Sequence, residues 1–202
     1  MKTLIAIPCY DSMRPEFVAS LFQLKTKDTQ LTFSIGTLID KARNDLTLKA
    51  INGEFDRILW IDSDMTFQPD YFEMLSKDLD EGRDFVSGLY FTRRAPLEPT
   101  ITKELGNGHK RAKMYLDYPK DSVFEIEASG FGFCLMKTEL LKKAAKRYKC
   151  SPFDMLPGMG EDFSCCWRLK EMGVKMYCDS RVKCGHVGTI VFSEELYEGS
   201  RK

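Results

Sequence analysis

Two aspartates in the first half of the chain have the types and spacing to bind a divalent cation. Asp62 and Asp64 are separated by one serine and directly follow residues 57–61, an apolar run typical of a buried strand. In extended backbone, residues i and i+2 point the same way, so the two carboxylates would form a strongly negative pocket. Mg2+ and Mn2+ prefer oxygen ligands and usually complete their shell with substrate phosphates. The alternative is a pair of turn or capping aspartates, but the next predicted helix begins near Pro69, too late for Asp64 to cap it.

Three further motifs carry residue types that binding and catalysis use, and each has a structural alternative. Glu161 and Asp162 open a predicted helix, where acidic residues are also favoured by capping and by the helix dipole. His186 lies in a Gly-His-Val-Gly sequence, and a lone histidine is more often structural than a ligand. Arg43-Asn44-Asp45 lies within a predicted helix, where a solvent-exposed face is the default interpretation. The motifs alone leave these alternatives open.

The elements that must position these residues alternate regularly over the first 91 residues. Apolar runs predict strands at 3–8, 31–35, 57–61 and 84–90, and helical periodicity predicts helices at 16–24, 37–52 and 69–81. Gly53 and Gly82 stand where C-terminal caps belong, and Pro69 is expected in a first turn. This alternation indicates a parallel sheet flanked by helices, and such sheets bind ligands outside the carboxyl ends of their strands.

The second half of the chain is expected to be mixed. Residues 92–123 have little periodicity and predict loops and short antiparallel strands over one edge of the sheet. Short strands are expected at 123–128, 133–136, 174–178 and 182–186, and helices at 138–149 and 161–172. One α/β domain with a small antiparallel extension explains both halves.

Composition excludes several classes of protein. The 202 residues suffice for one domain with a proper core. The 30 basic and 30 acidic residues cancel, which argues against a general polyanion binder. With 43% hydrophobic and 12% aromatic residues the chain is not disordered. No apolar run approaches the roughly 20 residues that span a bilayer.

The seven cysteines are an odd number and include no Cys-x-x-Cys pair. They predict reduced thiols and therefore a cytoplasmic protein. The alternative is a zinc site of Cys178, Cys184 and His186 with Cys165 or Cys166, but this spacing fits no common zinc-binding pattern.

Together the motifs resemble those of GT-A glycosyltransferases, in particular family 2-type enzymes and their bacterial and phage relatives. The resemblance extends over about residues 3–188 and includes, in order, Pro8-Cys9-Tyr10, Ala42-Arg43-Asn44, Trp60-Ile61-Asp62-Ser63-Asp64, Ser129-Gly130-Phe131-Gly132, Gly160-Glu161-Asp162 and Gly185-His186-Val187-Gly188. It implies a GT-A fold, with a Rossmann-like nucleotide-binding sheet, over residues 1–202. Residues 1–91 would bind the nucleotide sugar, residues 92–188 would face the acceptor, and residues 189–202 would form a tail.

The resemblance also implies a reaction and a set of donor contacts. A sugar would pass from a nucleotide-diphosphate sugar to an acceptor hydroxyl, with Mn2+ or Mg2+ as cofactor. The residues implied at the base, the ribose and the diphosphate are Pro8, Tyr10, Asp11 and Arg43. Asp62 would lie near the ribose or donor sugar and is also a candidate metal ligand. Asp64 would bind the metal and His186 would complete its shell.

The remaining implied roles concern the sugar and the acceptor. Gly130 and Gly132 would form the floor under the sugar, where absent side chains allow close approach. Asp162, or Glu161, would accept the proton of the acceptor hydroxyl. One departure concerns the base contacts: the family more commonly has Pro-x-Tyr-Asn-Glu, and here Tyr10 is followed by Asp11-Ser12.

Two other functions fit parts of this pattern. A nucleotidyltransferase acting on sugar phosphates would use a similar sheet and metal carboxylates, but it usually needs a glycine-rich loop with a basic residue near the first strand, and residues 8–15 contain no glycine. A non-catalytic nucleotide-binding module would not need the aspartate pair, the Glu161-Asp162 pair and His186 together.

The acceptor is left open among a glycan, a small molecule and a modified nucleobase in phage DNA. Residues 137–149 contain six basic residues and one glutamate, and residues 103–120 are also basic and include His109. Such segments can contact the phosphates of a nucleic acid. The favoured interpretation is a solvated helix face and loop. Neither the oligomeric state nor the stereochemistry follows from the sequence.

Overall fold

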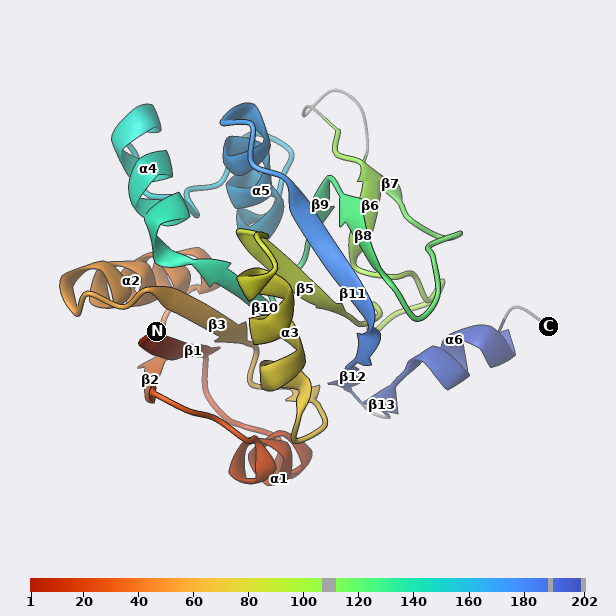
Figure 1. Cartoon of the computed structure of the whole chain (residues 1–202). Coiled ribbons are helices and arrows are strands. Elements are labelled where there is room, and N and C mark those ends of the chain that lie inside the picture. The colour runs from red at the N-terminus through yellow and green to blue at the C-terminus, as the bar shows by residue number, and fades with distance from the viewer. Residues whose placement is uncertain (107–111, 189–190, 201–202) are drawn as a thin grey trace.

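A seven-stranded sheet forms the middle layer of the computed structural model, which describes residues 1–106, 112–188 and 191–200 (Figure 1). Its strands are β1 (Thr3–Cys9), β2 (Thr29–Ile35), β3 (Arg57–Ile61), β5 (Phe85–Leu89), β8 (Val123–Ile126), β10 (Phe133–Lys137) and β11 (Met176–Lys183). Their order is β2-β1-β3-β10-β5-β11-β8. β1 is parallel to β2 and β3, and β5 is parallel to β11. β10 is antiparallel to both of its neighbours, β3 and β5, and β8 is antiparallel to β11. Apart from β10 and β8, all strands of this sheet run in the same direction, so the sheet is mostly parallel, as predicted.

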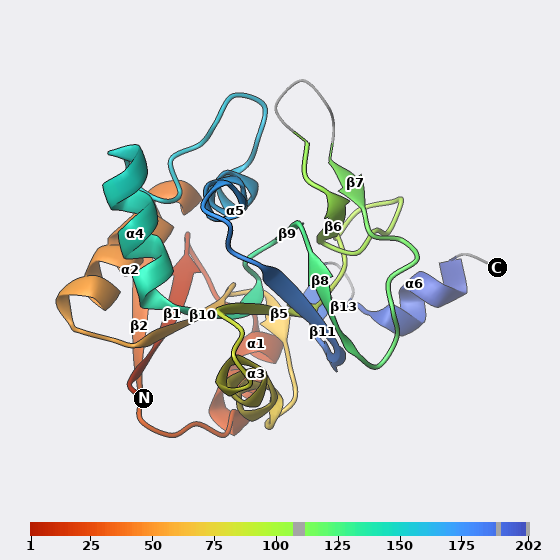
Figure 2. The same ribbon diagram turned by 45° about the horizontal axis from the view of Figure 1, so that its top comes forward.

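Helices cover both faces of this sheet. α2 (Ile39–Asn52), α4 (Thr138–Tyr148) and α5 (Glu161–Glu171) lie on one face, and α1 (Pro15–Gln23) and α3 (Tyr71–Asp80) lie on the other (Figure 2). The apolar sequence of β1 is explained by its position between the two layers of helices. Leu4 and Ala6 pack into the cluster that includes α2, α4 and α5, whereas Ile5 and Ile7 pack into the cluster that includes α1 and α3. A strand covered on both faces has no polar side to alternate with.

Two small antiparallel sheets complete the fold. One joins β6 (Ile101–Glu104), β7 (Lys113–Met114) and β9 (Ala128–Ser129), which confirms short antiparallel strands within residues 92–123. The other joins β4 (Met65–Thr66), β12 (Gly185–Val187) and β13 (Val191–Phe192). The predicted tail also contains a helix, α6 (Glu194–Ser200), whose Tyr197 stacks on Phe91 with ring centroids 4.6 Å apart. No helix within the described residues is long and apolar enough to cross a bilayer.

Several predicted boundaries are wrong for identifiable reasons. The strand expected at 174–178 continues to Lys183 as β11, whose pairing with β5 shifts register between Asp179 and Lys183, and the end of the strand expected at 182–186 belongs to a separate strand, β12. Pro69 precedes α3 rather than opening it. α2 does end before Gly53, but the left-handed residue is the next one, Glu54. Gly53 is instead required by close approach, because a Cβ there would lie 2.6 Å from the Phe55 ring.

Candidate active site

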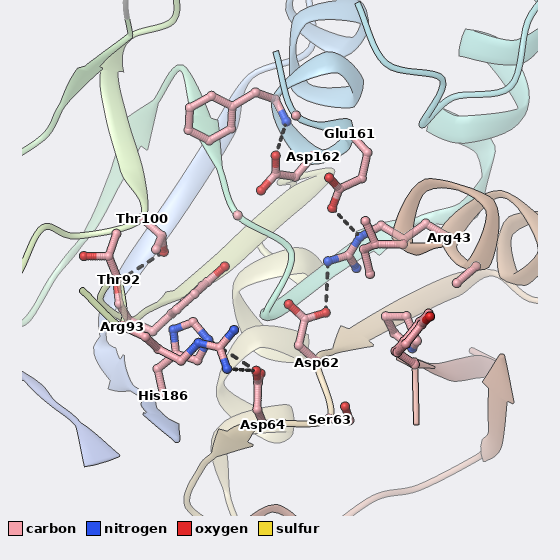
Figure 3. A pocket seen from close by; sticks show the side chains of 18 of the residues that line it. Arg43, Asp62, Ser63, Asp64, Thr92, Arg93, Thr100, Glu161, Asp162 and His186 are labelled. Atoms are coloured by element: carbon pink, nitrogen blue, oxygen red, sulfur yellow. Dashed lines mark hydrogen bonds and ion pairs between the residues drawn. The ribbon is translucent and has the colours of Figure 1, made fainter. Parts of the chain in front are cut away.

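A pocket of about 940 Å³ opens where β1, β3 and β5 end, at the carboxyl edge of the parallel strands (Figure 3). Its lining includes most of the residues predicted for the site: Pro8, Tyr10, Arg43, Asp62, Asp64, Gly130, Glu161, Asp162 and His186. Two predicted residues, Asp11 and Gly132, do not line it. Asp11 is exposed and accepts a hydrogen bond from Ser12. The contacts of Pro8, Tyr10 and Asp11 with a base stay predictions.

The backbone brings the two aspartates and His186 together. After β3 the chain turns, with the Met65 N–H donating to the Asp62 carbonyl at 3.2 Å. β12 pairs with β4, so His186 lies opposite Met65, and the Val187 N–H donates to the Asp64 carbonyl at 2.7 Å. Both carboxylates line the same pocket, as expected, but the backbone between them is a turn rather than extended. The turn separates them, and each takes different partners (Figure 3).

Arg43 is at the centre of a buried charge network. Only 2% of its side chain is exposed; Nη2 lies 2.9 Å from Asp62 Oδ1, and Nε lies 3.3 Å from Glu161 Oε1. Burial opposes its charge, but the carboxylates of Asp62 and Glu161 outweigh burial and raise the pKa of Arg43. Three aromatic rings have their centroids within 6 Å of the guanidinium carbon: Trp60, Phe131 and Phe153. The interpretation of residue 43 as part of a solvent-exposed face is therefore wrong.

Asp64 and His186 form the part of the site that fits a cation. His186 Nδ1 lies 2.8 Å from the carbonyl oxygen of Phe91, which can only accept, so Nδ1 carries a proton. The other ring nitrogen, Nε2, faces Asp64 Oδ1 at 3.5 Å. That oxygen is buried and has no hydrogen-bond partner in the described part of the chain. Burial would raise the pKa of Asp64, but His186 and Arg93 outweigh it and lower that pKa. A charged carboxylate facing an imidazole nitrogen suits a shared cation.

This pair could supply two ligands, not a complete protein cage. Within residues 1–106, 112–188 and 191–200, no three or more His, Cys, Asp or Glu side chains gather in a metal-binding group. Mg2+ and Mn2+ commonly keep several waters and substrate phosphates, so two ligands fit them. Asp62, predicted as a further ligand, is paired with Arg43 through Oδ1, and its role as a ligand stays a prediction. The seven cysteines are free thiols and belong to no such group, which leaves the zinc alternative without support.

The two acids of the Glu161-Asp162 motif have different surroundings. Glu161 pairs with Arg43, whereas Asp162 Oδ1 accepts a hydrogen bond of 2.7 Å from the neighbouring Phe163 N–H. Burial, followed by the negative charge of Glu161, raises the pKa of Asp162 to about 7, although Arg43 opposes this shift. A carboxyl that titrates near neutral pH inside a pocket is suited to general base catalysis. Of the two candidates, Asp162 therefore fits this role better.

Tyr90 is a site residue that the sequence analysis missed. It is buried directly after β5, its hydroxyl oxygen accepts the Gly132 N–H at 3.0 Å, and its ring lies edge-on to His186 with centroids 5.5 Å apart. A Cβ at Gly130 would lie 2.0 Å from Tyr90 Oη, and one at Gly132 would lie 2.8 Å from Tyr90 Cζ. Both glycines thus make room for a tyrosine. The available signal was its place at the carboxyl end of a predicted strand.

Gly130→Ala is expected to lower the free energy of unfolding by about 1–3 kcal/mol, the usual cost of overpacking. The ring of Tyr90 or the turn at residue 130 must shift to admit the methyl group. Urea titration measures the change. In a Tyr90→Phe background the same alanine should cost less, because the clashing oxygen is gone; equal costs in both backgrounds would contradict this explanation.

Arg93 was also missed. Its Nη1 lies 2.7 Å from Asp64 Oδ2 and 3.4 Å from the Val187 carbonyl oxygen. It follows β5 in a segment without helical or strand periodicity, so nothing in the sequence connects it with Asp64. Arg94 also lines the pocket.

The basic helix lies away from this pocket. Lys143 and Arg147 of α4 line a separate groove of about 590 Å³ together with Arg83 and Lys175. This groove lies near the start of β5 and of β11, at the edge of the sheet opposite the pocket. Within the other basic segment, 103–120, residues 107–111 and therefore His109 lie outside the described residues. The basic helix is therefore not part of this pocket, whereas Met114, from the described part of the second segment, lines it.

Comparisons with known proteins support the fold. No protein-family model matches the sequence, and no curated protein matches it. The crystal structure of A197 from STIV superposes with a TM-score of 0.67 over 93% of this chain and 86% of that chain, at 19% sequence identity. The structure of GalNAc-T7 with UDP, GalNAc and Mn2+ gives a TM-score of 0.64 at 10% identity. That match covers 93% of this chain and 44% of GalNAc-T7. The predicted GT-A-like α/β fold is confirmed.

Proposed function

We propose that this protein is a metal-dependent glycosyltransferase that moves a sugar from a nucleotide-diphosphate sugar to an acceptor hydroxyl. One observation carries the proposal. A single pocket of a GT-A-like fold combines the buried Asp64 oxygen that faces His186 Nε2 at 3.5 Å with Asp162, a carboxyl whose pKa lies near 7. The GalNAc-T7 structure, which contains UDP and Mn2+, supports the same kind of donor and cofactor.

Each of these residues has a separate role in the proposed reaction. Asp64 and His186 hold Mn2+ or Mg2+, which when bound neutralises charge on the departing nucleoside diphosphate. Arg43 holds Asp62 in place toward the ribose or donor sugar. Asp162 accepts the proton of the acceptor hydroxyl as its oxygen bonds to the anomeric carbon, and the diphosphate leaves with the electron pair of the broken bond. We place this reaction in the cytoplasm, as the odd number of cysteines indicates.

Asp64→Ala and His186→Ala are each expected to weaken Mn2+-dependent nucleoside diphosphate binding by about tenfold or more, the scale of a lost charged contact. Each change removes one of the two proposed ligands. Calorimetric titration with and without Mn2+ measures the affinity after a screen of nucleotides. Asp117→Ala is the matched control, because 76% of that side chain is exposed and its salt bridge to Lys103 is at the surface. Unchanged affinity and unchanged metal dependence in both site variants would refute the assignment.

A further inference from the structure

Each aspartate of the Asp62 and Asp64 pair has an arginine partner, but the two arginines are held very differently. Arg43 has 2% of its side chain exposed and is shared with a second carboxylate, Glu161. Arg93 has 46% exposed, and its ion pair in the described structure is with Asp64 Oδ2, at 2.7 Å. Arg43 is thus a fixed part of the fold, whereas Arg93 can leave its carboxylate at little cost.

The backbone that carries Arg93 is anchored close to the end of β5. Phe91 bridges to Pro99, and the Thr92 N–H donates to the Glu98 carbonyl at 2.9 Å. The side chain reaches from this anchored base to Asp64 at the pocket wall (Figure 3). A change of rotamer can therefore move the guanidinium without any rearrangement of the strand.

We propose that Arg93 is a donor-binding residue that exchanges partners, from the Asp64 carboxylate in the free protein to the diphosphate of a bound nucleotide. The inference rests on the proposed function. A cation on Asp64 takes up its negative charge and repels the guanidinium. A diphosphate that shares this cation places several negative oxygens within reach of Arg93, and the planar guanidinium suits phosphate oxygens.

This exchange couples the binding of metal and nucleotide. Mn2+ alone must compete with Arg93 for Asp64, so it binds weakly. Once a diphosphate offers the guanidinium another partner, that competition ends. Because coupling between two ligands is reciprocal, the same residue makes nucleotide binding depend more strongly on the metal.

Arg93→Ala should therefore change two affinities in opposite directions. Calorimetry with MnCl2 alone should give binding tighter by about threefold, the scale of an exposed salt bridge. Titration with UDP, GDP, ADP, CDP or dTDP, whichever binds the parent most tightly, at saturating Mn2+ should give binding weaker by about tenfold or more, as for a lost charge-assisted hydrogen bond. A damaged site would weaken both, so the opposite signs identify the exchange.

Arg94→Ala is the matched control. Arg94 is the neighbouring arginine on the same pocket, and among the residues that the structure describes it has no ion pair with Asp64. Its removal should leave the affinity for MnCl2 alone unchanged. If Arg93→Ala leaves the nucleotide affinity unchanged or weakens binding of MnCl2, the partner exchange is wrong while the proposed function stands. If the parent protein binds none of these nucleotides in the presence of Mn2+, the proposed function fails and this inference fails with it.

Discussion

An Asp162→Asn variant is expected to bind donor and cation like the parent protein but to transfer sugar about 100-fold more slowly or worse, the usual scale for a positioned proton acceptor. Asparagine keeps the shape and the hydrogen bond from the Phe163 N–H but cannot take a proton. The measurement is the single-turnover transfer rate at saturating donor. Near-parental turnover would exclude Asp162 as the base and shift the role to Glu161 or to a retaining mechanism.

The pKa of Asp162 gives this prediction a second readout. The parent rate should rise with pH through about 7, because the base must be deprotonated, and the variant should lose this rise. Stability should change in the opposite sense. A carboxyl whose pKa is raised by folding stabilises the folded state most at pH values below its ordinary pKa of 3.8. This contribution to stability is lost as the pH rises toward about 7. The melting temperature of the variant relative to the parent should therefore increase across that range.

If Asp162 only caps its helix, the melting temperature of the variant relative to the parent should instead decrease with rising pH, because a negative charge in a first helical turn stabilises the helix. Glu161→Gln is a poor control, since Glu161 pairs with the buried Arg43. Glu139 is a better one. It is an exposed acid in the first turn of α4, so Glu139→Gln removes a first-turn charge outside the pocket. A variant at Asp162 that behaves like Glu139→Gln in both readouts would show that residue 162 only caps its helix.

The largest loss of stability is expected from Arg43→Ala, which should lower the free energy of unfolding by about 3–5 kcal/mol, as breaking a buried ion pair does. Asp62 and Glu161 would be left in a half-buried site without their partner. Urea denaturation measures the change.

A triple variant separates charge from packing. Arg43→Met with Asp62→Asn and Glu161→Gln fills the space without leaving unpaired charge, so it should recover a large part of the lost stability. The single variant Arg43→Met restores packing but leaves both carboxylates unpaired. If it is as stable as the triple variant, the ion pairs are not what residue 43 contributes, and packing against the three aromatic rings is the better explanation.

The sequence predicted the elements that its own local pattern determines. A continuous apolar run identified β3, and the carboxyl end of that strand correctly located the pocket at Asp62 and Asp64. Helix α2 was less well predicted. The apolar Leu38 and Ile39 at its start are exposed and line the pocket, whereas the polar Arg43 and Thr47 are buried. A polar residue becomes a core residue only because distant carboxylates and aromatic rings meet it, and periodicity contains no information about those partners.

The same reason explains the missed residues. Tyr90 lies in the site because residues 130 and 132 leave room for it, and Arg93 because Asp64 is opposite it. Both relations join positions far apart in the chain. The predicted strand at 133–136 was correct, but where it enters the sheet depends on pairing with residues about fifty and seventy positions earlier, which a local pattern cannot indicate.

The position of β10 has a consequence for how the chain is made. β3 and β5 are synthesised first, yet they are not neighbours in the finished sheet. The strand that lies between them, β10, begins only at Phe133, well after β5 ends at Leu89. Until then two strands that are fully buried in the finished sheet present unpaired edges at its centre. Exposed apolar edges are templates for aggregation. The nascent chain thus passes through a vulnerable stage, and its folding depends on how long that central gap stays unfilled.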